Sequence, residues 1–214
     1  MRLCETTGVF AIKPSRMKTN RLEAFSDGVI AILITIMVLE LKAPHDPTPA
    51  SLARMWPTFF AYVLSFIIIA IYWVNHHHLI HLLTRVDSVV LWANINLLFW
   101  ISLIPWVTVY LGDNHALPFP VALYAAVSTA GGISFFLLRA AIAREHHHEP
   151  EFKRLNKKMA RKNLTAILIY IAAMAVAFVY TPLALVLIAT PAMMYFLPER
   201  GIGKFIGGMS AREP

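Results

Sequence analysis

The chain has 214 residues, of which 58% are hydrophobic and only 14% are charged, and its mean hydropathy is +0.61. A soluble domain of this size carries about 25% charged residues, so the composition excludes an ordinary soluble protein and indicates an integral membrane protein. The formal net charge of +7 does not indicate nucleic-acid binding, because the basic residues lie between apolar runs, where membrane topology explains them.

The first apolar stretch, residues 21–41 with the sequence RLEAFSDGVIAILITIMVLEL, is the most informative part of the chain. Its uncharged part, Gly28 to Leu39, is about 18 Å long as a helix, whereas the hydrocarbon core of a bilayer is about 30 Å thick. A spanning helix must therefore start near Glu23 and bring Ser26 and Asp27 with it. A carboxylate at that depth is costly without partners, so Asp27 indicates a functional position.

Five further apolar runs follow, and the last of them is short and interrupted by Pro191. They cover residues 58–73, 88–110, 119–143, 164–180 and 183–197. A proline-rich loop, residues 43–57, separates the first two runs, and a strongly polar segment, residues 144–163, separates the fourth from the fifth. Strand-type alternation long enough for a barrel is absent, so the pattern predicts an all-α membrane protein with six transmembrane helices.

This arrangement predicts three parts of the chain and one orientation. Residues 1–20 form an N-terminal tail, 21–198 the six-helix membrane domain and 199–214 a C-terminal tail. Of the 19 lysines and arginines, 17 fall on the side of the two tails, and only Lys42 and Arg54 fall on the other. The positive-inside rule then predicts a multi-pass protein of the cell membrane with both termini in the cytoplasm.

The same arrangement brings the few polar residues of the apolar runs together. The start of the first helix, the end of the second and the start of the third lie on the same side of the membrane. Asp27, either His76 or His77, and Asn94 can therefore meet at a similar depth and satisfy one another's hydrogen bonds. A proton-coupled secondary transporter that uses Asp27 and a nearby histidine is one function open to such a set.

Histidine-rich segments also raise the question of metal binding. The histidines are His76, His77, His78 and His81, and the triplet from His146 to His148. Adjacent histidines on a helix point apart, and no cysteine accompanies them, so we expect no metal site and no cofactor. Motifs of metalloproteases, α/β-hydrolases and nucleotide-binding loops are absent from the sequence, and we expect the protein not to be an enzyme.

The first helix carries an apolar stripe on one face. Its members follow a 4-3-4-3 spacing and are Phe25, Val29, Ile32, Ile36 and Leu39. Asp27 falls on a different face, together with Ile34. By periodicity alone, contact with lipid or packing in a core is the favoured explanation of such a stripe.

Motifs in the first three runs resemble those of the transmembrane protein 175 family, the potassium-permeable channels of endolysosomes and their prokaryotic relatives. The first motif is Arg21-x-x-x-Phe25-Ser26-Asp27. The resemblance continues with Tyr72-Trp73-x-Asn75-His76-His77, with Asn94 and with Pro105-x-x-Thr108. A chain with a single six-helix repeat resembles the prokaryotic form.

The resemblance implies a homotetramer in which the first helices line a central pore. The expected function is a potassium-permeable cation channel in a lipid bilayer, with potassium as the permeant ion. The positions implied to form its hydrophobic constriction are Ile32, Ile36 and Leu39, with Thr35 beside them. The residues implied to organise helix packing near the cytoplasmic entrance are Arg21, Phe25, Ser26, Asp27, Trp73, His76, His77 and Asn94.

Overall fold

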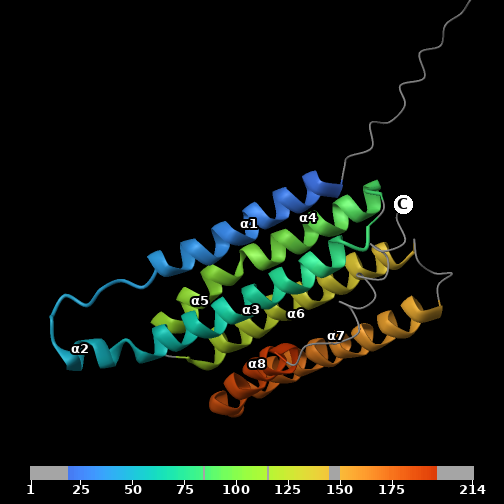
Figure 1. Cartoon of the computed structure of the whole chain (residues 1–214). Helices are drawn as coiled ribbons and strands as arrows, with labels where there is room; N and C mark the ends of the chain where they lie inside the picture. Colours follow the sequence, from blue (N-terminus) through green and yellow to red (C-terminus); the bar gives the residue numbers. More distant parts are fainter. Residues whose placement is uncertain (1–18, 84, 115, 145–149, 197–214) are drawn as a thin grey trace, which may run out of the picture.

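A computed structural model of the chain describes residues 19–83, 85–114, 116–144 and 150–196, so most of the predicted tails and the triplet from His146 to His148 lie outside the described residues. Every regular element in the described ranges is an α-helix (Figure 1). In chain order they are α1 (Thr19–Leu39), α2 (Pro49–Arg54), α3 (Trp56–Ile80), α4 (Ser88–Ser102), α5 (Ile104–Asp113), α6 (Pro118–Ala143), α7 (Pro150–Val176) and α8 (Thr181–Phe196).

Five helical stretches of the described chain are long and apolar enough to cross a membrane, and a shorter apolar helix follows them. The long stretches are α1, α3, α4 with α5, α6 and α7, and the short one is α8. The third predicted run is thus two helices that meet at Leu103. Pro105 explains the break, because it lacks the N–H that would bond to Ile101 and its ring clashes with that carbonyl.

Two segments that the sequence placed between helices are helical in part. The loop of residues 43–57 contains α2, which begins at Pro49 after Thr48, whose hydroxyl accepts a hydrogen bond from the Ser51 amide at 3.2 Å. The polar segment of residues 144–163 is helical from Pro150 onward. Helix α7 therefore starts well before its apolar part, and its first turns carry six of the seven lysines and arginines of that polar segment.

Polar contacts hold this extended part of α7 against α6. Arg139 donates from Nη1 to the backbone oxygen of Asn156 at 3.0 Å and to its side-chain oxygen at 2.9 Å. Further along, Asn163 donates to the backbone oxygen of Gly132 at 3.3 Å. A Cβ at position 132 would lie 3.0 Å from Ile167, so glycine permits the close approach of the two helices.

Helix α6 lies at the centre of the bundle and α1 at its edge (Figure 1). Helix α6 contacts α4, α5, α7 and α8, and many of its side chains are fully buried. Helix α1 packs mainly on α3, with further contacts to α4 and α5. The opposite edge is formed by α7 and α8 (Figure 1). One side of α1 is consequently not covered by any of the residues that the structure describes.

Candidate functional site

Helix α1 presents one buried and one exposed side. The buried residues are Leu22, Ser26, Ile30, Leu33 and Met37. The predicted constriction residues are all exposed in the single chain, at 56% for Ile32, 41% for Ile36 and 75% for Leu39. Thr35 is exposed as well, and its hydroxyl donates to the Ile32 carbonyl at 2.9 Å. These side chains are therefore available to a pore, to lipid or to another chain.

On the buried side, Ser26, Asn94 and His76 form a hydrogen-bonded set, here called the buried triad. All three are fully buried, and they come from α1, α4 and α3. The Asn94 amide nitrogen donates to the Ser26 hydroxyl at 2.9 Å, and the Asn94 amide oxygen lies 2.7 Å from His76 Nε2. The Ser26 hydroxyl in turn donates to the Leu22 carbonyl at 2.9 Å.

The chemistry of the amide sets the direction of every bond in the buried triad. An amide oxygen can only accept, so Nε2 of His76 carries the proton that bonds to Asn94. The amide nitrogen of Asn94 can only donate, so the Ser26 oxygen accepts from it and uses its own proton toward Leu22. Asn94 is thus the central member, and it joins three helices within the apolar interior.

A second set of contacts joins α1 to the end of α3. The indole nitrogen of Trp73 donates to Asp27 at 3.0 Å. One turn earlier in α1, Oε1 of Glu23 lies 3.3 Å from Nδ1 of His77 and 3.5 Å from Nε2 of His81. The two imidazoles approach each other at 3.1 Å between their Nε2 atoms.

Helical spacing explains why these side chains meet. Glu23 and Asp27 are four residues apart on α1, and Trp73, His77 and His81 are four residues apart along α3 and its C-cap. Residues four apart share one face of a helix. Because the two helices run antiparallel side by side (Figure 1), the earlier acid on α1 meets the later residues on α3.

The structure brings together six of the eight residues implied to organise packing. Ser26, His76 and Asn94 form the buried triad, while Asp27 meets Trp73 and His77 meets Glu23. Arg21 and Phe25 lie on exposed positions, Phe25 at 58%, and within the described residues Arg21 has no polar contact with this set. Asp27 therefore does not bond to Asn94 or His76, and Ser26 takes that place.

Sequence reasoning overlooked Glu23 and His81 as members of the site. Their four-residue spacing from Asp27 and His77 was visible, but it becomes informative only once the two helices are known to be antiparallel neighbours. A buried hydroxyl set was also missed: Ser65 lies 2.7 Å from the Tyr124 hydroxyl and 2.6 Å from the Thr108 hydroxyl, joining α3, α6 and α5.

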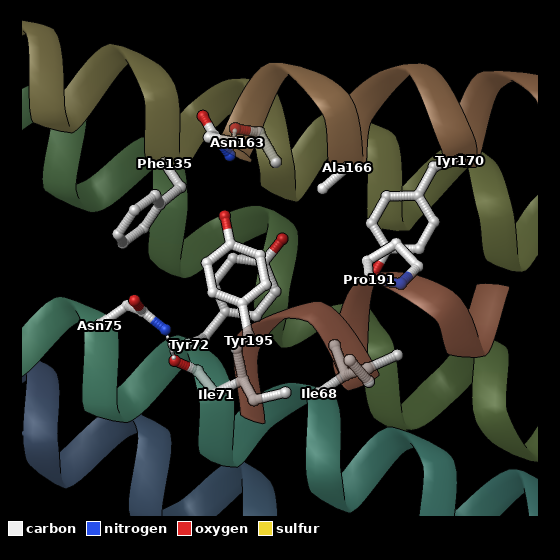
Figure 2. A pocket seen from close by; sticks show the side chains of 12 residues that line it. Ile68, Ile71, Tyr72, Asn75, Phe135, Asn163, Ala166, Tyr170, Pro191 and Tyr195 are labelled. Carbon is white, nitrogen blue, oxygen red and sulfur yellow. Dashed lines mark hydrogen bonds between the residues drawn. The ribbon is translucent and has the colours of Figure 1, made fainter. Parts of the chain in front are cut away.

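A pocket lies among α3, α6, α7 and α8 (Figure 2). Its walls are mainly apolar, with the side chains of Tyr72 and Asn75 from α3 and of Asn163 and Tyr170 from α7 facing it (Figure 2). None of its lining residues belongs to α1. The apolar stripe of α1 and this pocket are thus separate features of the chain.

Comparisons with known proteins identify relatives of the chain. The family described as the endosomal/lysosomal potassium channel TMEM175 matches residues 21–105, which include the whole buried triad. A potassium channel from a Chryseobacterium species is 40% identical over 189 residues, which cover 88% of this chain and 97% of that protein. A potassium channel from Streptomyces collinus is 36% identical over 138 residues, covering 61% of this chain and 67% of the other.

The fold is similar to a solved one. A crystal structure described as a lysosomal potassium-selective channel TMEM175 homolog from Chamaesiphon minutus matches with a TM-score of 0.75 and 29% sequence identity. The match covers 84% of this chain and 96% of that one. The sequence relatives and the fold agree along most of the chain, and this all-α, multi-pass membrane protein with five to six membrane helices belongs to the TMEM175 family.

Proposed function

We propose that the chain is the subunit of a potassium channel in the cell membrane, in which four copies assemble around a pore lined by α1. The observation that carries the proposal is the 40% identity to a protein named as a potassium channel, over 97% of that protein's length. The sequence-based prediction of a potassium-permeable channel, and not of an enzyme, agrees with the family to which the chain belongs.

The position of α1 supports a pore between copies. Its apolar stripe lies at the edge of the bundle, and the pocket inside the chain does not touch it. An ion path along this stripe therefore needs walls from other chains.

The arrangement of residues around α1 supports a ring of such helices. At 100° per residue, the buried side centres on Ser26 and Leu33, while Ala24, Gly28 and Ala31 form an exposed stripe of small residues about 170° away. The bulky stripe with Ile32 lies between these two sides, at about 90° to each. A helix held by its own chain on one side and by a neighbouring chain on the other would direct this bulky stripe to a central axis.

Rings of Ile32, Ile36 and Leu39 would then close the pore without a plug. Ile32 and Leu39 are about 10 Å apart along the helix, so the side chains form stacked apolar layers. A narrow apolar constriction loses its water, and an ion cannot shed its hydration shell there at tolerable cost. By the same 100° spacing, Thr35 lies on the side of Ala24 and Gly28, about 40° from Leu39 at the border of the bulky stripe. Its oxygen retains lone pairs for a cation at that border, because its proton is used toward Ile32.

Gly28 provides a test of assembly. An added Cβ at this position meets no neighbouring atom of the described residues within 4 Å, so the described fold of one chain gives no reason for a glycine that costs the helix about 0.5–1 kcal/mol. Small residues let membrane helices approach closely. We expect Gly28→Leu to leave the chain folded but to abolish the tetramer, as measured by light scattering in detergent.

Gly28→Ala is the matched control for this substitution, since alanine is also small. We expect the alanine variant to remain tetrameric. A tetrameric leucine variant would contradict the packing of another chain against this stripe.

The proposed orientation, with cytoplasmic termini, rests on the distribution of the basic residues. Asp46 lies between α1 and α2, and Asn114 lies at the end of α5. Exposed Lys157 lies on the basic part of α7. In a chain without Cys4, we expect single cysteines at the first two positions to react with an impermeant reagent added outside cells. Labelling of a cysteine at position 157 from outside would contradict the orientation.

Substitutions of Asp27 distinguish the channel from the proton-coupled transporter. In the structure, Asp27 accepts a hydrogen bond from Trp73, which asparagine can still do and alanine cannot. We expect Asp27→Ala to lower the free energy of unfolding by about 0.5–2 kcal/mol, the range for a hydrogen bond between membrane helices, and Asp27→Asn to keep both stability and current. A transporter that moves protons on Asp27 would lose its flux in the asparagine variant.

Single-channel recording from purified protein tests the function directly. In opposed gradients of potassium and sodium, we expect discrete current steps and a reversal potential displaced toward that of potassium. Flux that saturates with substrate and shows no unitary steps would favour the transporter, and absence of any flux would leave a non-conducting membrane scaffold.

A further inference from the structure

We propose that Glu23, His77 and His81 form a binding site for a borderline transition-metal ion of the Zn²⁺ class. One ligand atom from each of the three side chains lies within 4.8 Å of the others. A carboxylate and two imidazoles are the ligands that Zn²⁺ uses in open sites, where water takes the fourth position.

With either nitrogen of His77, two of the three distances between ligand atoms match those of a tetrahedral ion. Bonds of about 2.0–2.1 Å place neighbouring tetrahedral ligand atoms about 3.3–3.4 Å apart. Glu23 Oε1 lies 3.3 Å from His77 Nδ1 and 3.5 Å from His81 Nε2, and the two Nε2 atoms lie 3.1 Å apart. The first of these distances uses Nδ1 of His77 and the last uses Nε2, and His77 can offer only one of them. With one ligand atom per side chain the set lies within 4.8 Å, so the His77 ring must turn to bring all three atoms to tetrahedral distances.

The surroundings orient the site and leave it accessible. The Trp73 ring stacks on His77, with centroids 5.9 Å apart and an angle of 26° between the planes, which limits the motion of that imidazole. His77 and His81 are four residues apart, the spacing at which two helical histidines bind one ion. The side chain of His81 is 44% exposed, so an ion and its water can enter from solution.

A bound ion would connect α1 to the end of α3. This consequence rests on the proposed function, because there α1 lines the pore and must move for the apolar rings to widen. A metal bridge near the start of α1 would restrict that motion, so we expect Zn²⁺ to reduce the current.

Metal binding can be measured without any ion flux. Untagged protein in detergent is titrated with Co²⁺, whose visible absorption reports tetrahedral coordination, and Zn²⁺ is then added to displace it. We expect one Co²⁺ per chain in this site. His81→Ala and Glu23→Gln should each weaken its affinity at least tenfold. Neither removes a member of the buried triad, and His81 lies beyond the end of α3, so the fold is expected to persist.

Two controls separate this site from other histidines. His78→Ala removes a neighbouring imidazole that does not belong to the set, and alanines at His146, His147 and His148 remove the triplet. Both variants should retain the Co²⁺ spectrum. The proposal is overturned if His81→Ala and Glu23→Gln bind as the unchanged chain does, or if the spectrum is lost only with the triplet.

Recording in the presence of Zn²⁺ then tests the consequence for conduction. We expect a reduced current in the unchanged chain and none of this effect in His81→Ala. If the ion binds through these ligands and the current is unchanged, the restriction of α1 is wrong while the site stands. Absence of current without metal would contradict the proposed function and leave the binding result intact.

Discussion

Replacement of Ile32 by asparagine is expected to raise the basal current at least about tenfold and to weaken the preference for potassium over sodium. Ile32 is 56% exposed on the bulky stripe of α1. An amide in that ring gives water two donors and an acceptor, so the constriction stays hydrated and the cost of moving an ion through it falls. A tenfold gain corresponds to a barrier lower by about 1.4 kcal/mol. Single-channel recording measures both effects.

Ile133→Asn is the matched control for this substitution. Ile133 is 45% exposed on α6, away from the helix that is proposed to line the pore. An amide at position 133 changes a surface of α6 that faces lipid or another helix, and we expect the basal current to be unchanged. Equal behaviour of the two variants would contradict a pore lined by this face of α1.

Replacement of Asn94 by alanine is expected to have the largest effect on stability. It removes the centre of the buried triad and leaves both Ser26 and His76 without that partner. Hydrogen bonds between membrane helices average about 0.6 and reach about 1.7 kcal/mol each, so two of them contribute about 1–3 kcal/mol. We expect the melting temperature of the purified protein to fall, together with the yield of tetramer.

Asn96→Ala, two residues further along α4, is the control. Asn96 is only half-buried and donates one hydrogen bond, to Ser134 at 2.7 Å, so its loss should cost less. A double-mutant cycle of Ser26→Ala with Asn94→Ala should show a coupling energy, because both changes remove the same bond. Additive effects would mean that the hydrogen bond between them contributes little.

Local sequence features predicted the membrane helices well because they depend on apolar run length. The runs that begin near residues 21, 58, 88 and 119 became α1, α3, α4 with α5, and α6. The start of α7 was not predictable from hydropathy, because its first turns are basic and are held on α6 through Arg139 and Asn156. Helix α2 was not predicted, because its sequence lies in a proline-rich loop. The side chain of Thr48 caps its first turn.

The candidate site was likewise predictable only in part. That polar residues gather at one end of the bundle followed from the order of the helices, because a carboxylate or amide in an apolar run needs partners. Which side chains pair did not follow from it. Asp27 bonds to Trp73, while Ser26 occupies the place beside Asn94, because neighbouring residues on a helix point about 100° apart and only the rotation of α1 against α3 and α4 selects one of them.

By itself, the sequence determined that this is an all-α membrane protein, and its motifs pointed to the family to which the chain belongs. These properties depend on composition, run length and local motifs. Only the tertiary structure decided that Glu23 meets His77 and His81, and that the stripe with Ile32 is left uncovered by the described part of its own chain. Both depend on how antiparallel helices are rotated and placed against one another. That placement is set by packing between residues that lie tens of positions apart in the sequence.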